Sequence, residues 1–248
     1  MCCRKLTSPP TYDDCVSNDG VTFSRRTFLA LGALVAAGCS STRSGSANNA
    51  APPVLPAPGG TFPATPEAIT SVAIVGDSIT EGSVEALTTT LTDAGVESLR
   101  IEGRRSRRIE VGNGKGDAPL SGIATVYGLL AEGLSPDAWV IELGTNDIGS
   151  YSGADEYGQL IDKILDMLPG RRLVWVNTYR EQYLDDTVLF NTVLAQRLAD
   201  RGDAVVADWF AVASAPDQGV LRTDNLHPNA NGQVALSLLV LQGLQQLS

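Results

Sequence analysis

The stretch Val72-Ala73-Ile74-Val75-Gly76-Asp77-Ser78-Ile79-Thr80 decides the fold. Four apolar residues, three of them β-branched, run into a Gly-Asp-Ser turn, which is typical of a short buried strand. In α/β sheets the chemistry gathers at the carboxyl ends of the strands. We therefore take Ser78 as a candidate nucleophile. For this residue alone, a serine that caps a helix N-terminus is the alternative interpretation.

Short apolar runs of the same kind recur along the chain and alternate with longer amphipathic stretches. The runs predict strands over 72–75, 98–101, 138–143, 173–176 and 204–207. The amphipathic stretches predict helices over 84–94, 122–131, 155–168, 186–200 and about 232–247, and Gly202 ends the fourth of these. This alternation predicts an α/β domain whose mainly parallel sheet carries helices on both faces.

Polar residues follow four of the five predicted strands, and we expect them to meet at one edge of the sheet. Gly144-Thr145-Asn146-Asp147 follows the third strand, and the amide of Asn146 is suited to donate to an oxyanion. His227, the only histidine, follows the fifth strand after a long loop, with Asp224 three residues before it. Serine, histidine and aspartate are the parts of a nucleophilic acyl-transfer site. Each motif alone also fits an ordinary turn or loop.

Taken together, Gly76-Asp77-Ser78, Gly144-Thr145-Asn146-Asp147 and Asp224-x-x-His227 resemble three motifs of the SGNH hydrolases, the GDSL-type esterases and lipases. The resemblance spans nearly the whole domain and implies a three-layer α/β/α sandwich with a flavodoxin-like, five-stranded, mainly parallel sheet. It also implies that Ser78 is the nucleophile, His227 the base and Asp224 its orienting partner. The N–H of Ser78 and the amide of Asn146 would hold the oxyanion, and no cofactor or metal is expected.

A third oxyanion donor is implied by the family's second motif, which follows the second strand. Here that stretch reads Ile101-Glu102-Gly103-Arg104-Arg105-Ser106-Arg107-Arg108. Gly103 is its only glycine, whereas the register of related sequences points to Ser106. Both Gly103 and Ser106 have a backbone N–H, so both assignments stand at this point.

The stretch from Arg100 to Arg108 holds five arginines in a chain whose formal net charge is −10. One interpretation is an anion-binding pocket beside the nucleophile, and the other is that these arginines offset local acids or lie in a solvated loop. The acidic balance argues against nucleic acid as a partner. The three tryptophans lie in or beside predicted strands and are expected in the core, not in a sugar-binding surface; they are Trp139, Trp175 and Trp209.

Residues 1–39 read as a signal segment. Arg25 and Arg26 precede an apolar run too short to cross a bilayer, which resembles a twin-arginine export signal; an ordinary Sec signal is the alternative. The run ends in Ala36-Ala37-Gly38-Cys39, which resembles a lipobox, so we expect Cys39 to carry a lipid on the outer face of the cell membrane. A plain cleavage site, giving a secreted protein, is the alternative. The segment before this signal is unusually long, so the protein as translated could begin at Met1 or at Val21.

Residues 40–66 are rich in small and polar residues and are expected to form a flexible tether, so the globular domain covers 67–248. The other three cysteines lie before Cys39, so the domain contains no internal disulfide. We expect an exported serine esterase that removes a small acyl group, such as acetyl, from a carbohydrate. Two alternatives remain: an acyltransferase to a sugar hydroxyl with the same residues, and a surface lipoprotein that binds without catalysis.

Overall fold

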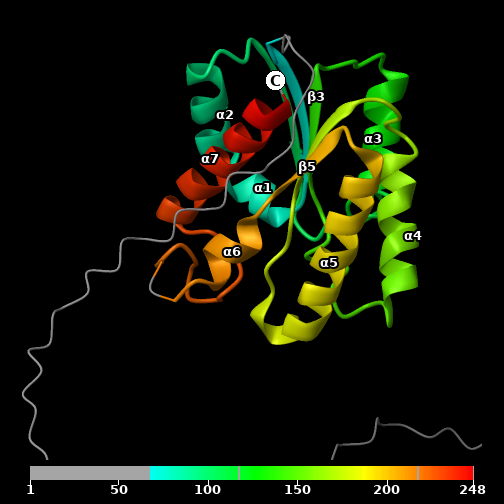
Figure 1. Ribbon diagram of the computed structural model, residues 1–248, viewed down its shortest axis with the longest axis vertical. Coiled ribbons are helices and arrows are strands. Elements are labelled where there is room, and N and C mark those ends of the chain that lie inside the picture. Colours follow the sequence, from blue (N-terminus) through cyan, green and yellow to red (C-terminus); the bar gives the residue numbers. More distant parts are fainter. Residues whose placement is uncertain (1–67, 117, 217, 248) are drawn as a thin grey trace, which may run out of the picture. The chain divides into compact units, whose positions relative to one another are not determined.

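The computed structural model describes residues 68–116, 118–216 and 218–247, and the strands of this part form one sheet (Figure 1). The strands are β1 (Ser71–Gly76), β2 (Ser98–Gly103), β3 (Ala138–Glu142), β4 (Arg172–Val176) and β5 (Ala204–Ala207). All neighbouring pairs are parallel, in the order β2-β1-β3-β4-β5. The predicted parallel sheet with flavodoxin-like strand order is confirmed.

In the described ranges, five longer helices and three short ones lie between the strands or follow the last one. They are α1 (Ser78–Gly82), α2 (Val84–Asp93), α3 (Gly122–Ala131), α4 (Ala154–Leu165), the 3₁₀ helix η1 (Glu181–Tyr183), α5 (Leu184–Arg201), α6 (Trp209–Ser214) and α7 (Ala230–Leu247). The five longer helices match those predicted, and Gly202 ends α5 with a φ of 83°. The sequence did not indicate α1, η1 and α6, because such short helices show no 3.6-residue period.

The helices cover both faces of the sheet and complete the predicted three-layer sandwich (Figure 1). Helices α3, α4 and α5 pack on one face, and α2, α6 and α7 pack on the other. Successive side chains of a strand point to opposite faces, so β1 contributes to both cores. Ala73 and Val75 belong to the first core, whereas Val72 and Ile74 belong to the second.

The three tryptophans are fully buried, which confirms that they belong to the core; they are Trp139, Trp175 and Trp209. None of the helices in the described ranges is long and apolar enough to cross a membrane. The predicted signal segment, the lipid-bearing Cys39 and the tether all lie outside the described residues, so those expectations remain predictions.

Candidate active site

The turn between β1 and α1 places Ser78 at the carboxyl edge of the sheet. Asp77 is the N-cap of α1 and accepts a hydrogen bond from the N–H of Ile79 at 2.9 Å, so Ser78 is the first residue of the helix and not its cap. Gly76 has no space for a side chain, because a Cβ there would lie 1.9 Å from Thr80 Oγ1. The absence of a side chain at Gly76 thus lets α1 begin directly above β1.

The loop before α7 holds His227 and Asp224 in one compact turn. Asp224 Oδ1 accepts from the N–H groups of Leu226 at 3.0 Å and His227 at 2.9 Å. The N–H of Arg222 donates to the carbonyl of His227 at 2.8 Å, and Leu221 forms a bridge with Pro228. These local bonds fix the loop on both sides of the imidazole.

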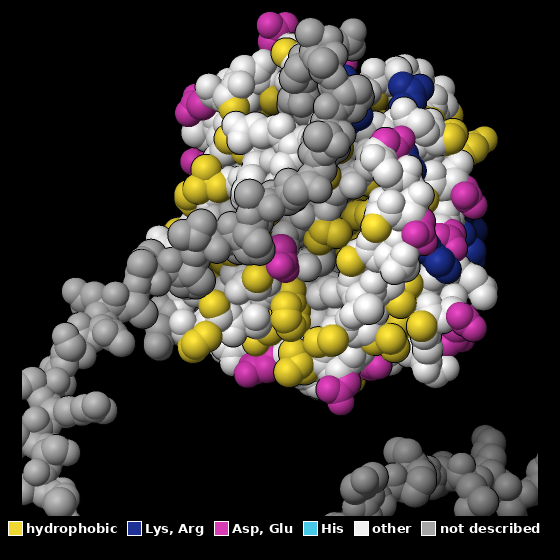
Figure 2. All heavy atoms as spheres, viewed as in Figure 1, with side chains coloured by type: hydrophobic (Ala, Val, Ile, Leu, Met, Phe, Trp, Pro, Cys, Tyr) yellow, Lys and Arg dark blue, Asp and Glu magenta, His cyan; other side chains and the backbone are white. Residues whose placement is uncertain are grey.

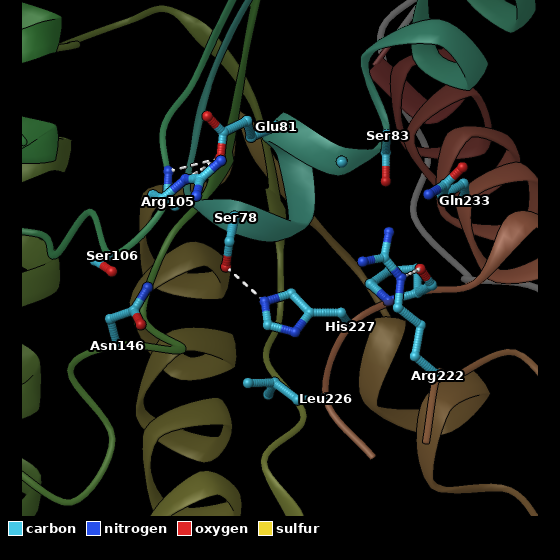
Figure 3. A pocket seen from close by; sticks show the side chains of 12 residues that line it. Ser78, Glu81, Ser83, Arg105, Ser106, Asn146, Arg222, Leu226, His227 and Gln233 are labelled. Atoms are coloured by element: carbon cyan, nitrogen blue, oxygen red, sulfur yellow. Dashed lines mark hydrogen bonds and ion pairs between the residues drawn. The ribbon is translucent and has the colours of Figure 1, made fainter. Parts of the chain in front are cut away.

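The side chains of Ser78, His227 and Asp224 form one hydrogen-bonded chain, and Figure 3 shows its contact between Ser78 and His227. His227 Nδ1 lies 2.9 Å from Asp224 Oδ2, and His227 Nε2 lies 3.0 Å from Ser78 Oγ. Partial burial raises the pKa of Asp224, but hydrogen bonds from the N–H and imidazole of His227 outweigh it and bring the pKa to about 2. An ionised carboxylate only accepts, so Nδ1 carries the imidazole proton and Nε2 is left to accept from the serine hydroxyl.

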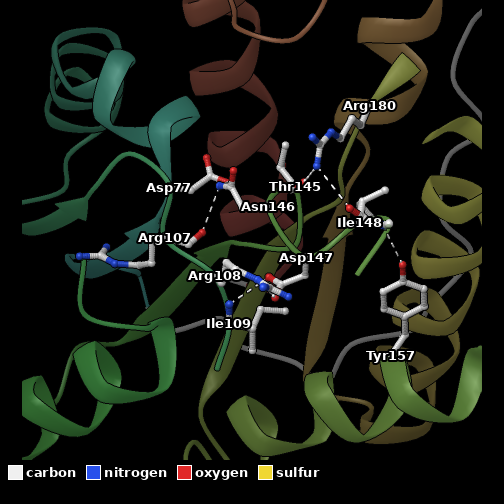
Figure 4. A network of polar contacts seen from close by, with 11 residues as sticks. Asp77, Arg107, Arg108, Ile109, Thr145, Asn146, Asp147, Ile148, Tyr157 and Arg180 are labelled. Carbon is white, nitrogen blue, oxygen red and sulfur yellow. Dashed lines mark hydrogen bonds and ion pairs between the residues drawn. The ribbon is translucent and has the colours of Figure 1, made fainter. Parts of the chain in front are cut away.

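Asn146, from the loop after β3, lies beside Ser78 in the same pocket (Figure 3). Its Nδ2 donates to Asp77 Oδ2 and to the carbonyl of Arg107, both at 3.1 Å (Figure 4). Two neighbouring loops therefore determine the direction of the amide. Gly144 has a φ of 128°, and a Cβ there would lie 2.5 Å from Phe190 Cζ, so this loop requires a glycine.

The two candidates for the second-motif donor occupy different places. Gly103 is the last residue of β2 and packs under α1, where a Cβ would lie 2.5 Å from the nitrogen of Glu81. Ser106 lines the pocket with Ser78 and Asn146, and its φ of 60° is one that favours glycine. The structure thus brings Ser106, and not Gly103, to the pocket that Ser78 and His227 line.

The backbone N–H groups of Ser78 and Ser106, which both line this pocket, have no acceptor among the described residues. The next three N–H groups of α1 are bonded, since Ile79 donates to Asp77 Oδ1, Thr80 to Glu142 Oε2 and Glu81 to the carbonyl of Asp77. An unpaired N–H costs free energy unless water or a ligand satisfies it. Both groups are therefore available to an oxyanion.

Behind Ser78 lies a buried pair of acids, Asp77 and Glu142, which are 0% and 3% exposed. Glu142 Oε2 accepts from the N–H of Asp77 at 3.2 Å and from the hydroxyl of Thr80 at 2.9 Å. The two carboxyl groups also hydrogen-bond each other, which requires a proton on one of them. Burial raises the pKa of Asp77 to about 6, and burial together with the nearby Asp77 charge raises the pKa of Glu142 well above its usual range. We place the proton on Glu142, so that Asp77 stays anionic and accepts from Asn146.

Asp147 joins the loops after β2 and β3 (Figure 4). Its carboxylate accepts from Arg108 Nε at 3.1 Å and from the N–H of Ile109 at 2.9 Å. Burial raises the pKa of Asp147, while these two partners oppose the shift. Asp147 is fully buried, and its two bonds fix Ser106 and Asn146 relative to each other, because each of these residues lies within three positions of a bonded residue.

The arginine-rich stretch is mostly structural, which supports the second interpretation of its sequence. Arg100 pairs with Glu102, Arg105 with Glu81, and Arg108 with Asp147. Arg107 is buried and donates to the carbonyls of Gly76 and Glu102, at the ends of the first two strands, and to that of Leu120 in the loop before α3. Of the five, only Arg105 lines the pocket.

The pocket around Ser78 and His227 has a volume of about 610 Å³, and most of the residues that line it are polar (Figure 3). The residues that line it are Ser78, Glu81, Gly82, Ser83, Arg105, Ser106, Asn146, Arg222, Leu226, His227, Pro228 and Gln233. Sequence reasoning did not single out Glu81, Ser83, Arg222 or Gln233, which belong to no motif. Arg222 lies two residues before Asp224, and this proximity was the only signal available for it.

The chain is similar to known proteins in both its family and its fold. A family model described as GDSL-like lipase/acylhydrolase matches residues 74–235. None of the curated proteins matches the chain. Among solved structures, the catalytic domain of a peptidoglycan O-acetyltransferase from Streptococcus pneumoniae is similar, with 20% identity, a TM-score of 0.54, and coverage of 73% of this chain and 96% of that one.

Two further structures share the fold. A family 3 carbohydrate esterase from Clostridium thermocellum has 20% identity and a TM-score of 0.53 over 72% of this chain and 98% of its own. A lipase/acylhydrolase from Enterococcus faecalis has 18% identity and a TM-score of 0.57 over 72% of this chain and 96% of its own. At these identities the likeness establishes the three-layer fold alone.

Proposed function

This chain belongs to the GDSL-like lipase/acylhydrolase family, a family of carboxylic ester hydrolases, and on that premise we propose that Ser78, His227 and Asp224 form its catalytic triad. The observation that carries the proposal is the continuous chain of hydrogen bonds from Asp224 through His227 to Ser78 Oγ. In such an arrangement the carboxylate orients the imidazole, and Nε2 is directed at the hydroxyl proton.

In the acylation step, Ser78 Oγ attacks the ester carbonyl while His227 Nε2 takes its proton. The carbonyl oxygen becomes an oxyanion that accepts from the N–H groups of Ser78 and Ser106 and from the amide of Asn146. We assign the second-motif donor to Ser106 because its N–H is unpaired at the pocket. An oxyanion would compete with the Arg107 carbonyl for one proton of the Asn146 amide.

Collapse of the tetrahedral intermediate breaks the bond to the alcohol, whose oxygen takes the proton from His227. Water then attacks the acyl carbon of the acyl-serine, with His227 again accepting a proton. Release of the carboxylic acid returns the proton to Ser78 Oγ. Asp224 stays ionised and stabilises the imidazolium throughout.

We propose a small acyl group on a carbohydrate as the substrate. Leu226 and Pro228 are the only large apolar residues among those that line the pocket, and two residues do not form a channel for a long acyl chain. Hydroxyl, amide and guanidinium groups instead surround the triad and suit a hydroxylated alcohol. A carbohydrate esterase and a peptidoglycan O-acetyltransferase with the same fold support this choice.

A chain-length series of p-nitrophenyl esters tests the proposal on the full chain. We expect the highest kcat/KM with acetate, and a loss of roughly 10⁴-fold or more in Ser78→Ala and His227→Ala. Ser214→Ala, an exposed serine outside the pocket, is the matched control and should behave as wild type. Equal rates in all four proteins would overturn the mechanism, and a preference for long chains would overturn the substrate class.

Acyl transfer to a sugar hydroxyl is the second candidate, because one of the similar folds is that of an O-acetyltransferase. The same residues would serve, with a sugar hydroxyl in place of water in the second step. Product analysis with an acetyl donor, in the presence and absence of an added glycan, separates the two. Acetylated glycan as the main product indicates transfer, whereas free acetate in both samples indicates hydrolysis.

For its location, we propose export and anchoring of the domain to the outer face of the membrane through a lipid on Cys39. The lipobox-like Ala36-Ala37-Gly38-Cys39 supports this proposal. Intact-mass measurement of the membrane fraction tests it, since a lipidated Cys39 adds the mass of acyl chains to a chain that begins at that residue. Cys39→Ala should release the protein from the membrane, and an unchanged distribution would contradict the proposal.

A further inference from the structure

Arg222 places a guanidinium in the catalytic pocket without a carboxylate to neutralise it. In the part of the chain that the structure describes, no acidic side chain forms an ion pair with Arg222. The other arginine of the pocket, Arg105, pairs with Glu81 at 3.4 Å. Arg222 is an exposed residue of the pocket lining, and an unpaired cation at the pocket of an acidic protein points to an anionic ligand.

The Arg222 side chain is held in place by the loop that carries His227. Its Nε donates to the carbonyl of Pro228 at 3.0 Å, and its backbone N–H donates to the carbonyl of His227 at 2.8 Å. This structural role uses Nε only and leaves the two terminal nitrogens for other partners. Gly82 leaves space beside them, since even a Cβ there would lie 3.8 Å from Nη2.

Two further polar side chains converge with Arg222 from other elements (Figure 3). Gln233 comes from the first turn of α7, and its side-chain amide has no partner among the described residues. Ser83 comes from the junction of α1 and α2 and is only 1% exposed, at the wall of the pocket. Its Oγ donates to the carbonyl of Ile79 at 2.7 Å, so toward the pocket it can act only as an acceptor. An arginine, an amide and a hydroxyl acceptor together suit a carboxylate carried on a sugar.

The position of this group relative to the triad shows which part of the ester it would contact. Ser106 and Asn146 lie on one side of Ser78, whereas Arg222, Ser83 and Gln233 lie beyond His227 on the other (Figure 3). The alcohol oxygen takes its proton from His227, so the alcohol leaves on the histidine side. The side chains of Arg222, Ser83 and Gln233 therefore face the alcohol part of the substrate and not the acyl group.

We propose that Arg222, Gln233 and Ser83 form a subsite for a carboxylate on the alcohol part of the ester, so that the preferred substrate is an acylated acidic sugar. This inference rests on the proposed esterase function and adds the charge of the substrate to it. Arg222 and Gln233 donate to the carboxylate, and Ser83 accepts from a neighbouring hydroxyl. No residue of the subsite takes part in bond making.

Two acetyl esters that differ only in charge test the subsite: a monoacetylated methyl glucuronoside and the equally acetylated methyl glucoside. With the full chain at low salt, we expect kcat/KM to favour the uronate by about tenfold, chiefly through KM, because the contact forms on binding. The preference should shrink as ionic strength rises, because salt screens an exposed charge pair.

Three variants make the experiment decisive. Arg222→Gln should bring the ratio of kcat/KM for the two esters close to one. Gln233→Glu should do the same, because the new carboxylate pairs with Arg222 and repels the substrate, while the Arg222 bonds to the His227 loop stay intact. Arg104→Gln is the matched control, since it removes the same charge from an exposed side chain outside the pocket and should keep the wild-type ratio.

The outcomes separate the subsite from the esterase function. A wild type that hydrolyses both sugar esters with equal kcat/KM overturns the subsite and leaves the esterase proposal standing. A preference that survives in both Arg222→Gln and Gln233→Glu also overturns it. A wild type that hydrolyses neither sugar ester but cleaves p-nitrophenyl acetate overturns the acidic sugar as substrate, and one that cleaves no ester at all overturns both proposals.

Discussion

At the scale of single residues, local turns form the site, and buried residues outside the pocket orient the side chains that line it. Asp77 is the clearest case, since one carboxylate caps α1, accepts from Asn146 and bonds to Glu142. The residue that precedes the proposed nucleophile thus orients both the helix that carries Ser78 and the amide proposed to hold the oxyanion. Such residues act through their neighbours and do not touch the substrate.

The amide of Asn146 gives the first prediction. Asn146→Ala should lower kcat for p-nitrophenyl acetate by about 10²- to 10³-fold with a smaller change in KM, because the donor acts on charge that develops in the transition state. Steady-state kinetics measures this split. Asn191→Ala, a change of the same type remote from the pocket, is the control for loss of an amide. A variant that changed only KM would show that Asn146 binds the ground state instead.

The buried pair Asp77 and Glu142 gives a second prediction, on how the free energy of unfolding depends on pH. In the unfolded chain both carboxyls ionise near pH 4, whereas burial raises the pKa of Asp77 and Glu142 in the folded protein. The native state therefore binds more protons, and the free energy of unfolding falls as pH rises through and above this range. Glu142→Gln mimics the neutral acid and still donates to Asp77, so this decline should be reduced in the variant.

Urea unfolding at pH 5.5 and pH 8.5 measures the effect. Between these values the wild type should lose on the order of 1–3 kcal/mol more stability than Glu142→Gln, since one pKa unit corresponds to about 1.4 kcal/mol. The wild type and the variant share all other titrating groups, so the contribution of those groups cancels when the two proteins are compared. If the free energy of unfolding depended on pH equally in the two proteins, the proposed proton on Glu142 would be contradicted.

At the scale of elements, the junction of β1 and α1 decides whether Ser78 reaches the pocket. Gly76→Ala should destabilise the protein by about 2 kcal/mol or more, because the new Cβ would overlap Thr80 and crowd Glu142. The matched control is Gly128→Ala in α3, where a Cβ meets nothing within 4 Å and should add about 0.5–1 kcal/mol of helix stability. Denaturant unfolding of both variants tests the pair, and similar changes in stability would contradict the close packing at Gly76.

Prediction from sequence succeeded best for the long elements. The sequence patterns predicted the bounds of all five strands and the five longer helices to within a few residues of those observed. This succeeded because the periodic alternation of apolar and polar residues is a local property of the sequence. Helices α1 and α6 and the 3₁₀ helix η1 are too short for the apolar period to repeat, and α1 is specified by its Asp77 cap and by Glu142 of β3. Their existence depends on contacts that the sequence does not display.

At the scale of the molecule, the two core clusters and every proposed site residue except Cys39 lie between residues 71 and 247. A chain that begins at Glu67 should therefore keep the thermal unfolding midpoint and the kcat/KM of the full chain on soluble esters. Calorimetry and steady-state kinetics on both chains test this boundary. A lower midpoint for the shorter chain would show that earlier residues belong to the folded domain.

The sequence by itself determined the α/β alternation and the order of the strand-end motifs, because burial periodicity and turn-forming residues are local properties. It also identified Ser78, His227 and Asp224 as a group, since only one histidine is available and its aspartate lies one turn away. These residues are close in the structure because parallel strands bring their carboxyl ends to one edge.

The tertiary structure alone decided how the surrounding residues divide between support and pocket. It placed Ser106 and not Gly103 at the pocket, paired three of the five arginines with acids, and brought Arg222 together with Gln233 and Ser83. These positions and ion pairs depend on the paths of the loops and on which acidic side chain lies nearest to each arginine. Those distances are set only when helices from distant parts of the chain pack on the sheet.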